Sequence, residues 1–368
     1  MGRTRREPAR SRASSAGRTR VAPAGRARKR TSATVVVPDN LARIVTELHG
    51  EAGREWLTRL PRLVATHARN WSLTVSPPFS SLSYNYVAPA VRSDGTDVVL
   101  KVGFPDRGLV TEIDALRCYD GKGVARLIEA DPQRGVLLLE RLTPGVPLST
   151  ERDDRRATSS AVDVMQRLWR PPPAGKAFPS VTAWARGWQK LRERFHGGTG
   201  PLAARLVDAS ERLFAELLDS MAEPVLLHGD FHHGNILAAK RRPWLAVDPK
   251  GVIGEPAYEA GALLRNPWPR LLAEPYPARV LARRVDQLAE ELRFDRARIL
   301  GWGVAQAVLS AWWSLDDHGH GWEWGMTCAD LLAGLARTRA RSRRPAAGTR
   351  TRGSTHRRTG VPPGRRSC

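Results

Sequence analysis

One stretch, residues 225–267, sets the tightest limits on what this chain can fold into. It reads VLLHGDFHHGNILAAKRRPWLAVDPKGVIGEPAYEAGALLRNP. Short apolar runs alternate with a polar loop at 228–235 and a basic, proline-containing turn at 240–243, which predicts a polar loop followed by a β-hairpin. The hairpin would bring Asp230, Asn235 and Asp248 to one end. Three oxygen-bearing side chains that converge beside a glycine-containing loop indicate a chemical site rather than an ordinary surface.

These side chains match the needs of a magnesium-dependent reaction. Mg²⁺ takes oxygen ligands, commonly from one or two side chains together with substrate phosphates, and Asn235 and Asp248 could supply them. Asp230 could then orient an attacking hydroxyl and accept its proton. The histidines at 228, 232 and 233 leave a transition-metal site as the alternative, but no further ligand stands at zinc-like spacing. For the first of them, His228, a structural hydrogen-bonding role is expected instead.

Residues 71–140 predict an antiparallel sheet with one helix inserted after its third strand. Alternating apolar residues mark strands at 71–75, 84–91 and 97–102, and an Asp-Gly turn at 93–96 joins the last two. Further strands follow at 124–129 and 136–140. Lys101 closes the third strand, and Glu112 lies one turn into a helix at 109–119. We expect the two to form an ion pair that presents the lysine to phosphates. A snorkelling lysine and a solvated acid are the alternative.

Helical periodicity covers most of the remaining chain. It predicts helices at 41–48 and 53–68 before the sheet. After a break at 143–147, interpreted as a hinge, it predicts helices at 152–170, 181–195, 201–220, 279–293, 297–317 and 325–339. Five of the twelve tryptophans lie beyond residue 300, where we expect them to fill a helical core. The fold class is therefore α+β, with a small antiparallel β-rich lobe followed by a larger α-helical lobe.

The net charge of +22 is concentrated at the two ends of the chain. Residues 1–30 hold eleven Lys and Arg against one acid, and residues 337–368 hold eleven Arg and no acid, so the rest of the chain carries about +1. The segments 1–34 and 340–368 are therefore expected to be disordered basic tails. They would associate with polyanions only weakly and non-specifically, or carry no role, and no specific nucleic-acid partner is expected.

The three cysteines are far apart and form no metal-ligand pair, which favours a reducing compartment. There is no signal-peptide pattern and no apolar run approaching 18 residues. The sequence thus predicts a cytoplasmic protein that does not bind membranes, and it leaves the oligomeric state open.

The spacing of the polar loop also carries a family resemblance. Asp230-x-x-x-x-Asn235, followed by an Asp after a short hairpin, resembles the catalytic layout of the protein-kinase-like fold, and the His-Gly-Asp form with Asp-Pro is similar to aminoglycoside phosphotransferases. More narrowly, HGDFHHGNIL, WLAVDPKGVIGEPAYEAGALLRNP and SLSYNYVAPA with VVLKVGFP resemble the branch of streptomycin 6-phosphotransferases and hydroxyurea phosphotransferases. The similarity covers roughly residues 40–335. It implies a bilobal protein-kinase-like fold, with 35–142 as the nucleotide-binding N-lobe and 143–339 as the C-lobe that holds the catalytic loop and the acceptor site.

The resemblance also implies roles for particular residues. Asp230 would be the catalytic aspartate, Asn235 and Asp248 the Mg²⁺ ligands, Lys101 the contact to the α- and β-phosphates of ATP with Glu112 as its partner, and residues 140–142 (Glu140 to Leu142) the backbone contacts to adenine. The loop at 79–85 departs from the protein-kinase pattern because it contains no glycine. Small serines such as Ser83 are expected to contact the phosphates instead. Pro-Lys-Gly also follows Asp248, where protein kinases have Phe-Gly.

Streptomycin carries two guanidinium groups, so a pocket for it should contain carboxylates. The candidates are Glu255, Glu259, Asp316, Asp317 and Glu323, with Tyr258 and Trp322 as stacking partners. Plain solvation of the helix-end acids is the alternative. The resemblance implies an ATP- and Mg²⁺-dependent kinase that inactivates an aminoglycoside, most directly at the 6-hydroxyl of streptomycin. The competing hypotheses are a kinase of hydroxyurea or another small molecule, and a non-catalytic kinase-like protein that binds polyanions through its tails.

Overall fold

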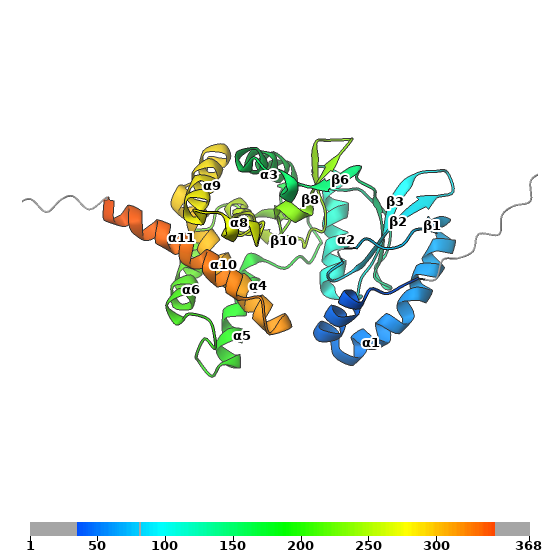
Figure 1. Ribbon diagram of the computed structural model, residues 1–368, viewed down its shortest axis with the longest axis horizontal. Helices are drawn as coiled ribbons and strands as arrows, with labels where there is room; N and C mark the ends of the chain where they lie inside the picture. Colours follow the sequence, from blue (N-terminus) through cyan, green and yellow to red (C-terminus); the bar gives the residue numbers. More distant parts are fainter. Residues whose placement is uncertain (1–34, 81, 343–368) are drawn as a thin grey trace, which may run out of the picture. The chain divides into compact units, whose positions relative to one another are not determined.

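The computed structural model describes residues 35–80 and 82–342, and Figure 1 shows their course. The expected disorder of the tails therefore lies outside the described residues, apart from 340–342. Those three residues belong to the last helix, α11 (Glu323–Ser342), which runs slightly further than the sequence predicts.

The N-terminal lobe is built on the expected antiparallel sheet. Its strands are β1 (Leu73–Val75), β2 (Tyr86–Arg92), β3 (Asp97–Val102), β4 (Leu127–Asp131) and β5 (Val136–Glu140), and their spatial order is β1-β2-β3-β5-β4. Every pairing between neighbours is antiparallel. The helix α2 (Arg107–Tyr119) follows the third strand, as predicted.

The two faces of this sheet pack against different partners (Figure 1). Because side chains alternate along a strand, Val136 and Leu138 face a core shared with the first helix, α1 (Asp39–Asn70). Leu137 and Leu139 point the other way and join the core that contains α2 and most of the second lobe. Lys101 pairs with Leu137 across β3 and β5, so its side chain faces α2. The alternation of side chains along β3 thus places Lys101 on the side of the sheet that faces the helix carrying Glu112.

The two helices predicted at 41–48 and 53–68 are both present, and a kink between them joins them into α1. It is helical from Asp39 to Asn70 except at Gly50, whose φ of 54° and ψ of −129° kink it. A residue with a β-carbon is strained at that φ, so the glycine explains why the helical run bends there.

The predicted hinge at 143–147 is wrong, because this segment forms a strand. β6 (Pro144–Pro147) pairs with β8 (Ile236–Ala239), and β8 pairs in turn with β9 (Trp244–Ala246). A second small sheet joins β7 (Val225–Leu227) to β10 (Val252–Gly254). The segment between β7 and β10, which contains Asp230, Asn235 and Asp248, is therefore fixed at both ends by strand pairing.

Helices make up the rest of the second lobe. They are α3 (Asp154–Leu168), α4 (Val181–Trp184), α5 (Arg186–Arg194), α6 (Ala204–Asp219), α7 (Ala260–Leu264), α8 (Arg270–Ala273), α9 (Pro277–Leu292) and α10 (Arg296–His318), followed by α11. The expected tryptophan core is only partly present: Trp302 and Trp312 are buried on α10, whereas Trp324 on α11 is 38% exposed. Within the described residues, no helix combines the length and apolar character needed to cross a membrane.

Candidate active site

The β8–β9 hairpin brings the two expected metal ligands together. Ile236 pairs with Ala246, so the residues that flank this pair, Asn235 and Val247, are neighbours, and the Val247 N–H donates to the Asn235 carbonyl at 2.9 Å. Asp248 follows directly and adopts a left-handed φ of 58°. The convergence expected from the spacing of the apolar runs is present.

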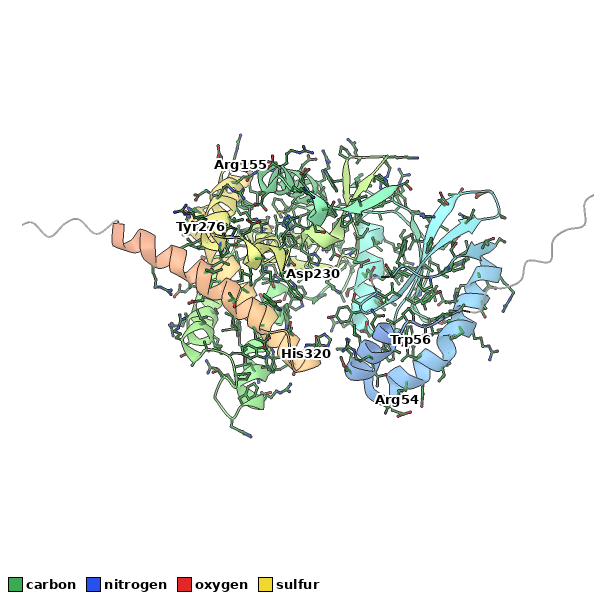
Figure 2. All side chains as sticks on the ribbon, viewed as in Figure 1. Arg54, Trp56, Arg155, Asp230, Tyr276 and His320 are labelled. Atoms are coloured by element: carbon green, nitrogen blue, oxygen red, sulfur yellow. The ribbon has the colours of Figure 1, made fainter. Side chains whose placement is uncertain are left out.

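Asp230 lies beside this pair, at a place where side chains of the two lobes meet (Figure 2). The Asn235 side-chain amide donates to the Asp230 backbone carbonyl at 3.0 Å, which ties the loop to the hairpin. The Asp230 carboxylate is 31% exposed and lies 3.7 Å from the Arg265 guanidinium and 3.8 Å from the His232 ring. Burial opposes its charge, but the neighbouring positive groups outweigh burial and lower the pKa of Asp230. It is therefore a carboxylate at neutral pH and can accept a proton.

Lys101 joins the two lobes. Its ammonium donates to Glu112 Oε1 at 2.6 Å and to Asp248 Oδ1 at 3.0 Å, and the residue is only 1% exposed. Burial alone would lower the pKa of Lys101, yet the two carboxylates raise it, so the side chain stays charged. The strand-then-helix spacing thus yields the expected ion pair, and the pair also reaches Asp248.

Two buried residues hold the catalytic loop in place. The Glu259 carboxylate accepts from the backbone N–H groups of His228 at 2.7 Å and Gly229 at 2.9 Å. The His228 ring contacts the Val247 carbonyl at 2.8 Å through Nε2 and accepts from the Asp230 N–H at 3.3 Å through Nδ1. His228 therefore has the structural role expected of it. The anchoring role of Glu259 was missed, because a sequence shows an acid but not the backbone groups that it accepts from.

The end of β5 is tied to the β8–β9 hairpin by an ion pair that the sequence did not predict. Glu140 ends β5, and its carboxylate receives two hydrogen bonds from Arg241 in the β8–β9 turn, at 3.0 and 2.7 Å. The same guanidinium donates to the carbonyls of Gly121 and Val124. Leu142 is buried in a small cluster with Leu245. Ser83, in contrast, is exposed in the loop before β2.

Three of the expected acceptor residues are instead committed inside the fold. Glu255 is 1% exposed and pairs with Arg298 at 2.7 Å, with the Trp302 indole and with the Ala222 N–H. Tyr258 is also 1% exposed and packs edge-on against the Trp302 ring. Glu259 anchors the loop as described above. These contacts argue against the expectation that the three residues receive a substrate, because none of them presents a free group to solvent.

The two remaining acceptor candidates of this group, Asp316 and Asp317, lie at the end of α10, and only one of them is paired within the described fold. Asp316 pairs with Arg194 at 2.7 Å, so its charge is already balanced within the fold without a ligand. Asp317 is exposed and has no such partner among the ion pairs of the described residues. Burial, then the charges of Asp317 and Asp230, raise the pKa of Tyr84, so the Tyr84 hydroxyl lies within electrostatic reach of both acids. The same hydroxyl is 3.2 Å from His318 Nε2, which links the loop before β2 to α10.

The donor set fits Mg²⁺ better than a transition metal. In the described part of the chain, no group of three or more His, Cys, Asp and Glu residues is placed to hold a metal ion, which disfavours the zinc alternative. Asn235 and Asp248 offer oxygen atoms, and the Asp248 side chain is 44% exposed although one oxygen contacts Lys101. Two oxygen ligands with room for phosphates and water are what Mg²⁺ requires.

The site has the parts of a kinase-like phosphotransferase. Between a β-rich and a helical lobe it holds a buried lysine–glutamate pair, a carboxylate that can accept a proton and an Asn/Asp pair. Comparison with known proteins agrees. Residues 73–318 match the family described as aminoglycoside/hydroxyurea antibiotic resistance kinase. The chain belongs to this family, has its bilobal protein-kinase-like α+β fold, and is an ATP-dependent phosphotransferase with a hydroxyl acceptor.

Two individual relatives support the same family, and a solved structure supports the fold. The chain is 34% identical to streptomycin 6-kinase of Streptomyces glaucescens over 78% of this chain and 93% of that protein. It is 36% identical to hydroxyurea phosphotransferase of Kitasatospora aureofaciens over 78% of this chain and 83% of that protein. A solved aminoglycoside phosphotransferase, in a ternary complex with ADP and hygromycin B, superposes with a TM-score of 0.54 at 13% identity, covering 77% of this chain and 99% of that one.

Proposed function

We propose that this protein transfers the γ-phosphate of ATP to a hydroxyl group of an aminoglycoside, most directly the 6-hydroxyl of streptomycin, and thereby inactivates the antibiotic. The observation that carries the proposal is the set of contacts joining Lys101 to Glu112 and to Asp248 beside Asp230. Similarity to streptomycin 6-kinase supports the choice of acceptor.

In the proposed reaction, Asp230 binds the acceptor hydroxyl and takes its proton as the oxygen attacks the γ-phosphorus. Lys101 holds the α- and β-phosphates, and Glu112 keeps the lysine in position. Backbone groups of residues 140–142 contact the adenine. Asn235 and Asp248 would hold Mg²⁺, which neutralises charge on the phosphates when it is bound.

On the acceptor side we assign Asp317 as the carboxylate that receives a cationic group of the substrate. Of the five candidate acids, at 255, 259, 316, 317 and 323, it is the one that is exposed and also acts electrostatically on Tyr84, whose pKa Asp230 raises as well. Trp268 and Trp324 stack with ring centroids 5.3 Å apart and are 53% and 38% exposed. Trp268 lies three residues after Arg265, which contacts Asp230, so the pair offers a flat aromatic surface for a sugar or a guanidinium group.

Hydroxyurea is the second candidate acceptor, because the chain is as similar to hydroxyurea phosphotransferase as to streptomycin 6-kinase. Hydroxyurea is small and uncharged and needs no carboxylate. Substitution of Asp317 by Asn should therefore raise KM for streptomycin and leave turnover of hydroxyurea unchanged.

The test is a coupled assay of ADP release with streptomycin, kanamycin, hydroxyurea and no acceptor, followed by mapping of the phosphorylated oxygen. We expect turnover with streptomycin and phosphate on the 6-oxygen. Turnover with hydroxyurea alone would replace the first acceptor with the second. The Asp230→Asn variant should lose at least roughly 10²-fold in kcat with nucleotide binding retained, because it removes the proton acceptor. Wild-type turnover in that variant would disprove the mechanism.

A further inference from the structure

The loop between β1 and β2 is poorly suited to binding phosphates. Residues 76–85 contain no glycine, and two bulky side chains in the loop, Phe79 and Tyr84, are 42% and 43% exposed. Glycine-rich loops in phosphotransferases allow backbone N–H groups to approach the phosphates closely. Without glycine, the charge on the terminal phosphate has to be neutralised by another group.

Lys250 is placed to supply that charge. It follows Asp248 by two residues, and its backbone N–H donates to the His228 carbonyl at 2.7 Å, so its backbone is fixed to the catalytic loop. Gly229 has a φ of 85°, and a β-carbon there would lie 3.2 Å from the β-carbon of Lys250. The glycine at 229 thus leaves room for the lysine stem next to Asp230.

The ammonium of Lys250 extends from this loop towards the other lobe. It lies 6.0 Å from the centroid of the Tyr84 ring, in the glycine-free loop. Its charge acts on both Asp230 and Asp248, since it is among the groups that lower the pKa of each carboxyl. Lys250 therefore follows Asp248 closely in the chain and extends its ammonium to Tyr84 in the glycine-free loop.

Lys250 also differs from the other cations of the site because it is not committed to a carboxylate. Lys101 is bound to Glu112 and Asp248, and Arg265 donates to Gln306 at 3.1 Å and lies 3.7 Å from Asp230. Within the described residues, no carboxylate lies within 4.0 Å of the Lys250 ammonium, whose side chain is exposed. A strongly hydrated, uncommitted ammonium is suited to bind a phosphate that arrives with the substrate.

We propose that Lys250 binds the γ-phosphate of the nucleotide and neutralises the charge of the phosphoryl group during transfer, in place of backbone contacts from a glycine-rich loop. This proposal rests on the proposed function for the location of the nucleotide. A bond forms between the acceptor oxygen and the γ-phosphorus, the bond from that phosphorus to the β–γ bridging oxygen breaks, and the hydroxyl proton goes to Asp230. Lys250 neither gives nor takes a proton. When no nucleotide is bound, its ammonium rests near the Tyr84 ring.

The experiment compares Lys250→Ala and Lys250→Arg with a matched control, Lys240→Ala. Lys240 is also exposed but lies in the β8–β9 turn, away from Asp230. Removing one group that stabilises transition-state charge typically costs 10²- to 10³-fold, so we expect a loss of about 10²-fold in kcat for Lys250→Ala, partial recovery for Lys250→Arg and no change in the control. Because Lys250 is exposed, thermal unfolding of all three variants should match the wild type.

Nucleotide binding separates this role from a structural one. Calorimetry with Mg²⁺ should show ADP binding to Lys250→Ala within about twofold of the wild type, and a non-hydrolysable ATP analogue binding roughly tenfold more weakly, which corresponds to one lost charged contact. Equal weakening of both ligands, or wild-type kcat, would overturn the proposal. These binding measurements involve no acceptor, so they test Lys250 even if streptomycin proves not to be the substrate.

Discussion

Two buried residues explain how the Asp230 carboxylate keeps its position. His228 is fully buried, and its ring contacts the Val247 carbonyl and the Asp230 N–H, while Glu259 receives the N–H groups of the two residues before Asp230. Nδ1 of His228 accepts a hydrogen bond from a backbone N–H, and Nε2 faces a carbonyl. Only the neutral ring with its proton on Nε2 can make both contacts. The loop geometry therefore depends on the charge state of one imidazole.

Burial lowers the pKa of His228 to about 4, and this shift predicts an acid-side loss of stability. The unfolded chain binds a proton at this ring below pH 6.5, whereas the folded chain does so only near pH 4. Stability from this group is therefore complete above pH 6.5 and falls as the pH drops towards 4, by roughly 3 kcal/mol in all.

Urea unfolding of wild type and His228→Gln at pH 7 and pH 4.5 measures this contribution. Glutamine can still donate to the Val247 carbonyl but does not titrate. The free energy of unfolding should therefore fall less on acidification in the variant, and the difference between the two proteins removes the effect of other titrating groups, including the buried His233. An equal fall in both proteins would refute the prediction.

At the scale of elements, the sequence predicted what depends on local pattern. The sheet at 71–140 and the hairpin before Asp248 follow from alternation and turn residues within a few positions, and both are present. Strands β6, β7 and β10 are three or four residues long and pair with partners far away in the chain, so no local pattern marks them. β6 was consequently interpreted as a hinge.

The candidate site divides in a similar way. Lys101 and Glu112 are separated by a fixed strand-then-helix spacing, which allowed their contact to be predicted. Glu255 and Glu259 were placed at the acceptor because they are acids near the loop, but their partners are Arg298 and backbone N–H groups that only the tertiary structure reveals. A buried acid with internal donors looks the same in sequence as an exposed one that awaits a ligand.

The pair of Arg241 with Glu140 joins the end of the N-terminal sheet to the catalytic hairpin, so its loss should weaken the whole described fold. The side chains are 25% and 22% exposed, and Arg241 also satisfies two carbonyls. Arg241→Ala should lower the free energy of unfolding by about 1–3 kcal/mol, because it leaves the carbonyls of Gly121 and Val124 without this donor and the Glu140 carboxylate with only the Arg126 N–H. Equilibrium urea unfolding measures this.

The neighbouring Arg242 is the matched control because it is exposed in the same turn. Arg242→Ala should change the free energy of unfolding by no more than about 0.5 kcal/mol. Similar losses in both variants would show that the turn, and not the ion pair, is what matters.

At the scale of the whole molecule, the positive charge and the catalytic residues occupy different parts of the chain. Deleting residues 1–34 and 343–368 removes ten and eight net positive charges, so the net charge falls from +22 to +4. We expect kcat and the melting temperature to remain at wild-type values and the protein to elute from a heparin column at much lower salt, since retention follows the number of cationic contacts. Loss of turnover on truncation would show that the tails contribute to catalysis.

The internal anchoring of the catalytic loop also has an evolutionary consequence. Glu259 and His228 hold Asp230 from within the helical lobe, whereas Asp317, Trp268 and Trp324 lie on other segments and are exposed. In the acceptor site proposed above, mutations at these exposed positions would change which molecule is accepted without disturbing the hydrogen bonds that hold Asp230. A lineage with this construction can exchange one acceptor for another by a few surface substitutions, which fits relatives named for compounds as unlike as streptomycin and hydroxyurea.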